Sequence, residues 1–304
     1  MNRRDAVKAG LALGVAAVVP CRALFAQPQT LIQRKIPSSG ESMPVIGIGT
    51  ARRYDVEPDD PVRAELKEVL RQFAGAGGRV IDTAPSYGAA ESVVGDLVAD
   101  LGVRKSLFIA TKVGARHKEE GLQQIEESFR NLRTPQIDCM AVHNLMNTAE
   151  HLAVLRDLKR AGRIRYLGIS TSFDRQYPEF ENVISKEQLD FIQVDYALDN
   201  RDAGDRIIPL AADRGAGVMI NLPFGRGRLF RAVQNKQLPA WTGEFDCRTW
   251  AQFFLKYIVS HPAVTCAIPG TARTKYVPDN LGAARGRLPD ARMRKRMEEF
   301  IDHV

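Results

Sequence analysis

Residues 79–88 read R-V-I-D-T-A-P-S-Y-G, a pattern typical of a strand that ends in a loop. Val80 and Ile81 are β-branched and favour a short buried strand, and the proline, serine and glycine that follow break it. Asp82 therefore stands at the strand end, and Tyr87 follows on the loop. Taken alone, Asp82 is better explained as a turn cap and Tyr87 as a residue packed on the loop. Because both side chains can reach one cavity above the strand, we interpret the stretch as one edge of an active site.

Apolar strand patterns alternate with helical patterns along the chain. Strands are predicted at 45–50, from 79, and at 106–111, 137–142, 164–169, 189–194, 217–220 and 264–268. Between them, apolar residues recur at helical spacing, as at Leu66, Val69, Leu70 and Phe73 behind the cap Asp60-Pro61. The pattern predicts an α/β fold, a closed (β/α)8 TIM barrel, with an open doubly wound sheet as the alternative.

The barrel fold predicts where three further segments lie. Residues 31–43 predict a β-hairpin that plugs the barrel floor, and residues 289–303 predict a last helix that packs outside it. The longest irregular stretch, 222–244, follows the seventh strand. Loops after strands lie at the mouth of such a barrel, so we expect this stretch to cover the mouth.

Composition limits the classes of function. The chain has 304 residues, a mean hydropathy of -0.23 and a net charge of +7. Residues 1–26 contribute +3 of that charge, from Arg3, Arg4, Lys8 and Arg22 against Asp5. The remaining +4 is diffuse, and no basic run is interleaved with aromatic residues, so no nucleic-acid partner is expected.

The first 26 residues have the layout of an export signal. Arg3-Arg4 precede an uncharged run at 9–21, and small residues follow it, which resembles a twin-arginine (Tat) signal. We therefore expect residues 27–304 to form one barrel domain that the Tat machinery exports to the periplasm. The apolar run is too short for a permanent membrane span. A retained membrane anchor is the less favoured alternative.

The cysteines indicate neither a disulfide framework nor a metal site. Without Cys21 in the signal, three remain, an odd number without metal-ligand spacing. Cys139 and Cys266 lie in apolar strands and are interpreted as buried packing residues.

Polar side chains follow three consecutive strands. Asp82 and Tyr87 follow the second strand, Lys112 ends the third and His143 ends the fourth. A buried strand rarely contains a lysine without a partner, and Asp82 on the adjacent strand is the obvious one. Each residue alone has a structural explanation. All four at the carboxyl ends of neighbouring strands predict an active site.

Several motifs resemble the aldo-keto reductase superfamily over residues 31–282. They are D-T-A-x-x-Y-G-x-x-E at 82–91, T-K-V around Lys112, H-N at 143–144, G-I-S at 168–170 and S-H-P-A-V-T-C-A-I-P-G-T from 260. The resemblance implies a nicotinamide-dependent oxidoreductase that reduces an aldehyde or ketone, or oxidises the alcohol. It also implies that Asp82, Tyr87, Lys112 and His143 are the catalytic tetrad.

The chemistry of these residue types agrees with that activity. Reduction of a carbonyl requires a proton donor at the oxygen, and tyrosine, with a pKa of about 10, is a reluctant acid. Lys112, held charged by Asp82, is expected to lower the pKa of Tyr87, and His143 to orient the carbonyl by donating a hydrogen bond.

The hydride must come from a cofactor. No G-x-G-x-x-G follows a strand, which argues against a Rossmann site. Instead P-F-G-R-G-R from 223 and G-T-A-R from 270 follow the last two strands, where barrels hold phosphate. Barrel geometry and the resemblance together imply cofactor contacts from Thr50, Ser170, Thr171, Gln193, Asn221, Pro223, Gly225, Arg226, Gly227, Thr271, Arg273, Asp279 and Asn280.

NADP is the expected cofactor, with NAD as the alternative. Arg273 and Lys275 are near the place where many members of the superfamily bind the 2′-phosphate. Asn221 stands where the superfamily usually has an aromatic residue that stacks on the nicotinamide, and Thr171 where it usually has asparagine. These two departures motivate a second hypothesis, a nucleotide-binding sensor or accessory protein with little turnover. A metal-dependent barrel hydrolase or isomerase is less supported, because His143 is the only histidine at a strand end.

Overall fold

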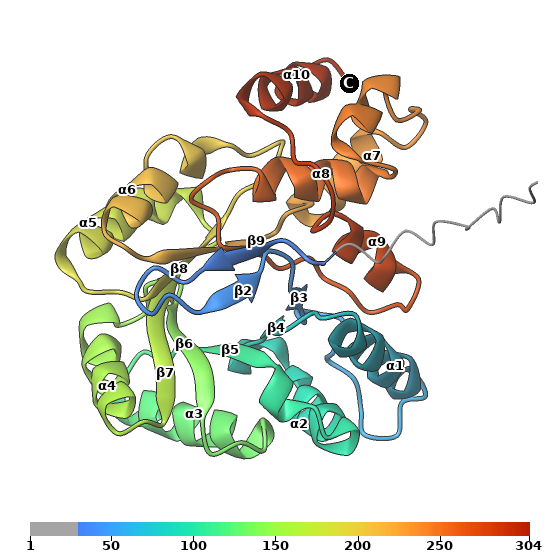
Figure 1. The fold of residues 1–304 in the computed structure, drawn as a ribbon. Helices are drawn as coiled ribbons and strands as arrows, with labels where there is room; N and C mark the ends of the chain where they lie inside the picture. The colour runs from blue at the N-terminus through green and yellow to red at the C-terminus, as the bar shows by residue number, and fades with distance from the viewer. Residues whose placement is uncertain (1–29) are drawn as a thin grey trace, which may run out of the picture.

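Eight parallel strands form the sheet at the centre of the protein, as seen in a computed structural model that describes residues 30–304 (Figure 1). They are β3 (Ile48–Gly49), β4 (Val80–Asp82), β5 (Phe108–Val113), β6 (Ile137–His143), β7 (Ile164–Ser170), β8 (Phe191–Asp195), β9 (Gly217–Asn221) and β10 (Cys266–Ala267). Backbone bridges join Ile46 to Ala267 and Gly49 to Gly270. The first strand therefore meets the last, which confirms the closed barrel and makes the open-sheet alternative wrong.

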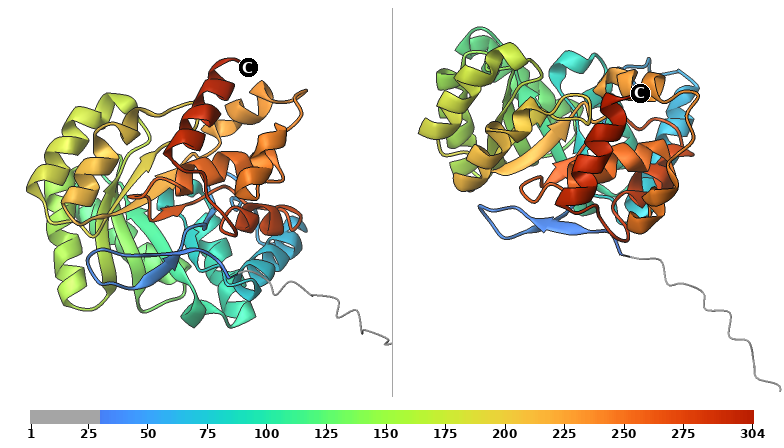
Figure 2. Two further views of the ribbon diagram at one scale, coloured as in Figure 1. Left: turned by 45° about the horizontal axis from the view of Figure 1, so that its top comes forward. Right: turned by 90° about the horizontal axis from the view of Figure 1, so that it is seen from above.

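Helices surround the barrel (Figures 1 and 2). They are α1 (Val62–Gly75), α2 (Ala90–Leu101), α3 (Lys118–Asn131), α4 (Thr148–Arg160), α5 (Tyr177–Lys186), α6 (Ile207–Asp213), α7 (Arg228–Ala232), α8 (Trp250–Val259), α9 (Tyr276–Gly282) and α10 (Ala291–Asp302). In α1 the four apolar residues at helical spacing, Leu66, Val69, Leu70 and Phe73, are all buried. The α1 cap differs in detail from the prediction: Pro61 occupies the N-cap position, and the Asp60 carboxylate accepts the Val62 N–H at 2.8 Å.

The predicted hairpin closes the barrel floor. Strands β1 (Gln33–Lys35) and β2 (Ser42–Pro44) pair antiparallel, and Ile36 and Met43 are 0% and 2% exposed. They belong to one buried cluster with Phe108 and other side chains from inside the strands. The Tyr166 hydroxyl of β7 lies 2.9 Å from Glu41 Oε2, which fixes the hairpin loop to the barrel.

The stretch after β9 is more regular than its sequence predicts. Residues 222–244 contain α7 and run into a 3₁₀ helix at Ala240–Phe245, so the expectation of an irregular loop was wrong there. Aromatic packing supplies the order: the ring of Trp241 lies 5.8 Å from that of Phe253 in α8 and 6.3 Å from that of Phe300 in α10, centroid to centroid. Helix α10 lies outside the barrel, as predicted (Figure 2).

The remaining expectations concern cysteines and the amino terminus. Cys139 and Cys266 are buried and free, as predicted, and so is Cys247. Strand β10 is only two residues long, shorter than the predicted 264–268. The predicted export signal at 1–26 lies outside the described residues. Within residues 30–304 no helix is both long and apolar enough to cross a membrane.

Candidate active site

The register of β4 and β5 brings Asp82 and Lys112 together. Asp82 lies opposite Ala110, so the Lys112 side chain starts two residues farther toward the barrel mouth. Its Nζ donates to both Asp82 carboxylate oxygens at 2.9 Å and to the Thr83 carbonyl oxygen at 2.8 Å. The two residues are 4% and 2% exposed. The expected ion pair is therefore present and buried.

Tyr87 and His143 complete the group. Tyr87 ends a 3₁₀ turn at Pro85–Tyr87, and the centre of its ring lies 5.2 Å from Lys112 Nζ. The ring of His143, at the end of β6, meets the Tyr87 ring edge-on at 6.1 Å between centroids. Tyr87, Lys112 and His143 line one cavity of 360 Å³. The structure thus brings together the side chains that the sequence places on three successive strands.

The ion pair keeps the lysine charged. Burial lowers the pKa of Lys112, but the charges of Asp82 and Tyr87 and the hydrogen bonds to Asp82 raise it, and the pKa ends above its ordinary value. Burial acts on Asp82 in the opposite sense and raises the pKa of that carboxyl, against the influence of Lys112 and Gln193. Lys112 is therefore a permanent cation beside Tyr87.

The pKa of Tyr87 corrects one expectation from the sequence. Burial raises it, and Lys112 only partly offsets this, so the pKa of Tyr87 stands above its ordinary value instead of below it. The geometry gives a reason. The three hydrogens of the Lys112 ammonium are directed to the two Asp82 oxygens and the Thr83 carbonyl, so Lys112 acts on the phenol mainly through its charge.

His143 is a neutral imidazole at physiological pH. Burial, with a smaller contribution from Lys112, lowers its pKa to about 3. Its Nδ1 lies 3.4 Å from the Ser86 hydroxyl oxygen. A neutral imidazole carries one N–H, so His143 has one hydrogen bond to donate. The Ser86 contact gives no signal in the sequence, because the two residues are far apart along the chain.

A larger cavity of 850 Å³ adjoins the first. Its walls include seven of the residues expected to contact a cofactor, namely Thr50, Asn221, Pro223, Arg226, Gly227, Asp279 and Asn280. They also include four aromatic residues that were not anticipated: Phe224, Phe230, Trp250 and Tyr276. An extended cavity with apolar walls and a few polar groups is typical of a cofactor site.

The other expected cofactor contacts occupy different positions. Ser170 and Gln193 line the 360 Å³ cavity, and Gly225 lines a third cavity farther along the mouth. Thr171 is buried instead, with its hydroxyl donating to Gln176 Oε1 at 2.6 Å. Thr271 is 2% exposed and accepts a hydrogen bond from Asn280 Nδ2 at 2.8 Å. Arg273 is exposed and lines none of these cavities.

Two buried oxygen atoms test whether the site fits a nicotinamide cofactor. Gln193 donates its amide to Asp82 Oδ1 at 3.0 Å, and Asn221 donates to the Thr171 carbonyl at 3.1 Å. Their carbonyl oxygens, Gln193 Oε1 and Asn221 Oδ1, have no hydrogen-bond partner among residues 30–304. An unsatisfied buried acceptor is costly. The amide N–H₂ of a nicotinamide is a donor of the kind that these two acceptors require.

Unusual backbone conformations concentrate around the cavities. Four non-glycine residues with positive φ, Arg52 (63°), Asn144 (51°), Leu222 (49°) and Arg226 (54°), all line the 360 Å³ cavity. Such conformations are uncommon outside glycine and cluster at functional sites. Among residues 30–304, no group of three or more His, Cys, Asp or Glu is arranged to hold a metal ion.

Comparison with known proteins supports one family. The model of the aldo/keto reductase family matches residues 45–301. Aldo-keto reductase YhdN of Bacillus subtilis (strain 168) is 30% identical over 177 residues, which are 53% of this chain and 53% of that protein. Aldo-keto reductase str7 of Strobilurus tenacellus is 25% identical over 300 residues, covering 85% of this chain and 88% of the relative.

The fold has close counterparts among solved structures. An aldo/keto reductase from Klebsiella pneumoniae, solved in complex with NADP and acetate, superimposes with a TM-score of 0.72 at 24% identity. The superposition covers 86% of this chain and 93% of the Klebsiella protein. At this identity the likeness concerns the fold alone.

Proposed function

The chain belongs to the aldo/keto reductase family of oxidoreductases, and from this premise we propose that it reduces an aldehyde or ketone with a nicotinamide cofactor, or oxidises the corresponding alcohol. One observation carries the proposal: Tyr87, Lys112 and His143 line a single cavity that opens into a larger one. The two cavities share Tyr87, Asn221 and Arg226 among their walls. A proton donor and a cofactor site therefore meet at one point.

Tyr87 is the general acid in reduction and the base in oxidation. Its raised pKa keeps the phenol protonated at neutral pH, so the proton is available when negative charge develops on the carbonyl oxygen. The Lys112 cation stabilises the tyrosinate that remains, and Asp82 keeps that cation charged in the buried site. General acid catalysis of this kind contributes about 10²- to 10⁴-fold in rate.

His143 orients the carbonyl. With a pKa of about 3 it remains neutral, and its N–H donates to the substrate oxygen without adding a second cation beside Lys112. The same side chain forms an edge contact with Tyr87, so donor and acid approach the oxygen from neighbouring directions.

The cofactor is NADP, with NAD as the alternative. When bound, it supplies the hydride that the protein lacks. Gln193 Oε1, which has no partner in the part of the chain that the structure describes, and Ser170, which lines the same cavity, would hold the nicotinamide amide. The loop from Gly225 to Gly227 and the residues around Asp279 would hold the phosphates and the adenine end. The NADP in the Klebsiella structure supports the choice of nucleotide.

The test pairs two tyrosine variants. Tyr87→Phe should lower the rate of NADPH-dependent carbonyl reduction by about 10³-fold, since the proton donor is lost, and should leave the NADPH dissociation constant unchanged. Tyr166→Phe is the matched control, because that hydroxyl lies at the barrel floor. A Tyr87→Phe enzyme with normal turnover would contradict the mechanism. NADPH binding without steady-state turnover on a broad carbonyl panel would favour the sensor or accessory role.

We also propose export to the periplasm through the Tat machinery, because of the sequence at residues 1–26. Tat transport carries folded proteins, which allows the cofactor to bind in the cytoplasm beforehand. Arg3→Lys with Arg4→Lys should retain the protein in the cytoplasm, as measured by fractionation. Unchanged export would contradict the Tat route, and a full-length chain in the membrane fraction would favour the retained anchor.

A further inference from the structure

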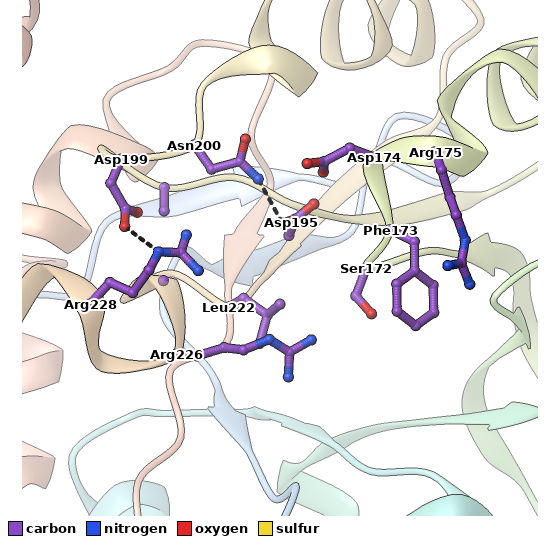
Figure 3. Close-up of a pocket in the computed structure, with 12 residues that line it drawn as sticks. Ser172, Phe173, Asp174, Arg175, Asp195, Asp199, Asn200, Leu222, Arg226 and Arg228 are labelled. Atoms are coloured by element: carbon purple, nitrogen blue, oxygen red, sulfur yellow. Dashed lines mark hydrogen bonds and ion pairs between the residues drawn. The ribbon is translucent and has the colours of Figure 1, made fainter.

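A third cavity of 500 Å³ extends the catalytic cavity along the barrel mouth (Figure 3). The two cavities share Ser172, Leu222 and Arg226, so they are adjoining parts of one space. The third cavity lies on the side of β7 and β8, away from the walls of the 850 Å³ cavity apart from Leu222 and Arg226. A substrate whose carbonyl lies at Tyr87 can therefore extend into it.

A buried carboxylate without a cation lies in the wall of this cavity. Asp195, at the end of β8, is 9% exposed. Its Oδ1 accepts the Tyr177 hydroxyl at 2.9 Å and its Oδ2 accepts the Asn200 amide at 2.8 Å. Within residues 30–304 it forms no ion pair. Each carboxylate oxygen has further acceptor capacity, so Asp195 can accept hydrogen bonds from a ligand.

The opposite wall carries a cation without a carboxylate. The Arg226 guanidinium is exposed, lines all three cavities and has no acidic partner in the part of the chain that the structure describes. Arg228 differs, because its Nε donates to Asp199 at 2.9 Å. Figure 3 shows Arg226 and Phe173 extending from different walls toward the same space. The cavity thus offers strong acceptors on one side and strong donors on another.

One aromatic ring beside these polar groups, that of Phe173, is partly exposed, with the Arg175 guanidinium over it at 4.9 Å from the ring centroid. Phe173 is 37% exposed, and its ring lines the cavity next to Ser172. An exposed ring beside planar acids, amides and guanidinium groups suits a ligand with an apolar face and a rim of hydroxyls. The wall carries Asp174, Asp195 and Asp199 and also Arg175, Arg226 and Arg228. Because these charges balance, the cavity suits a neutral polar ligand better than a carboxylate.

We propose that this cavity binds the neutral sugar portion of a polyhydroxylated substrate, while the carbonyl lies at Tyr87. The Phe173 ring stacks on the C–H face of the sugar. Asp195 accepts from its hydroxyls, and Arg226 donates to them. The inference rests on the proposed function, because it names the substrate class of the same site.

Three aldehydes test it. 4-Formylphenyl β-D-glucoside carries its sugar at a distance from the carbonyl, 4-methoxybenzaldehyde lacks the sugar, and 4-carboxybenzaldehyde carries an anion instead. The glucoside should be reduced with a kcat/KM about tenfold above that of 4-methoxybenzaldehyde, since remote contacts contribute to transition-state binding. The carboxylate should give no such gain. A gain for the carboxylate alone, or equal values for all three, would overturn the sugar assignment and leave carbonyl reduction intact.

Two variants test whether the preference for the glucoside arises in this cavity. Phe173→Ala and Asp195→Asn should each remove most of the preference for the glucoside while 4-methoxybenzaldehyde is reduced as before. Met146→Ala is the matched control, because Met146 is equally exposed at 37% and lines none of the three cavities. A glucoside preference that survives Phe173→Ala and Asp195→Asn would contradict the assignment of the cavity.

A binding measurement separates this inference from the proposed function. If no aldehyde is reduced, the proposed function fails, and calorimetry of the glucoside with the full chain still decides the sugar site. Binding that Phe173→Ala weakens would support the site. Absence of binding, or binding that Phe173→Ala leaves unchanged, would overturn it.

Discussion

The two sides of the barrel mouth differ in what fixes their polar side chains. On the side of β4 to β6, Asp82, Lys112 and His143 project from strands, and strand register sets their height. On the other side, the expected cofactor contacts come mostly from loops. Several of these side chains already form hydrogen bonds with other residues of the chain. Asp279 Oδ1, for instance, accepts the Thr249 hydroxyl at 2.7 Å. Strands therefore place side chains in a way that sequence periodicity predicts, whereas loops depend on long-range contacts.

The largest effect is expected from a substitution on the strand side. Asp82→Leu leaves the Lys112 cation buried without its carboxylate, which should cost about 3–5 kcal/mol of unfolding free energy. Denaturant titration measures the loss. Because a buried pair can be replaced by apolar residues at little cost, Asp82→Leu with Lys112→Met should recover most of it. If Asp82→Leu alone were as stable as the wild type, the Asp82–Lys112 ion pair would not be what stabilises the site.

A smaller effect is expected on the cofactor side, at Gln193 of β8, whose Oε1 accepts no hydrogen bond from residues 30–304. Gln193→Leu removes the Oε1 acceptor and should raise the NADPH dissociation constant about tenfold, the equivalent of one hydrogen bond. Thr171→Val should change it less than about twofold, because the Thr171 hydroxyl is directed to Gln176. Calorimetric titration measures both. The reverse ranking would mean that the loop rearranges when nucleotide binds.

Substitution of exposed arginines should change nucleotide affinity still less. Arg226→Gln should weaken NADPH and NADH binding alike by about threefold, since contacts at exposed charges are worth about 1 kcal/mol or less. Arg273→Gln should weaken NADPH alone if Arg273 binds the 2′-phosphate. The ratio of the two dissociation constants, at low and high salt, distinguishes the two arginines. An unchanged NADPH/NADH ratio in Arg273→Gln would remove Arg273 from the cofactor site.

The pH dependence should show no effect of His143. Its folded-state pKa of about 3 lies below the ordinary value of about 6.5, so the ring stays neutral until the pH falls toward 3. The kcat/KM for carbonyl reduction should therefore have no acid limb from this residue between about pH 5 and 8. Initial rates across that range measure it. An acid limb near pH 6.5 that His143→Gln abolishes would show that the imidazole is accessible to water.

The sequence predicts the barrel and its catalytic edge because both depend on local pattern. Val80-Ile81 before Asp82, and an apolar strand before Lys112, are enough to place the two charges on neighbouring strands. The Thr171 hydroxyl is different, since its partner Gln176 follows on a loop of undefined direction. The pKa of Tyr87 depends on burial and on where the Lys112 hydrogens are directed, which periodicity does not describe. The order in residues 222–244 likewise comes from aromatic contacts with distant helices.

The floor hairpin has a kinetic consequence. Ile36 and Met43 seal one end of the barrel, so nucleotide and substrate must enter and leave through the same mouth. The cavities assigned to them share the walls formed by Tyr87, Asn221 and Arg226. A substrate seated at Tyr87 would obstruct the nicotinamide end of the nucleotide. The proposed arrangement therefore predicts that the nucleotide binds first and leaves last. Product-inhibition patterns of an ordered reaction would test this order.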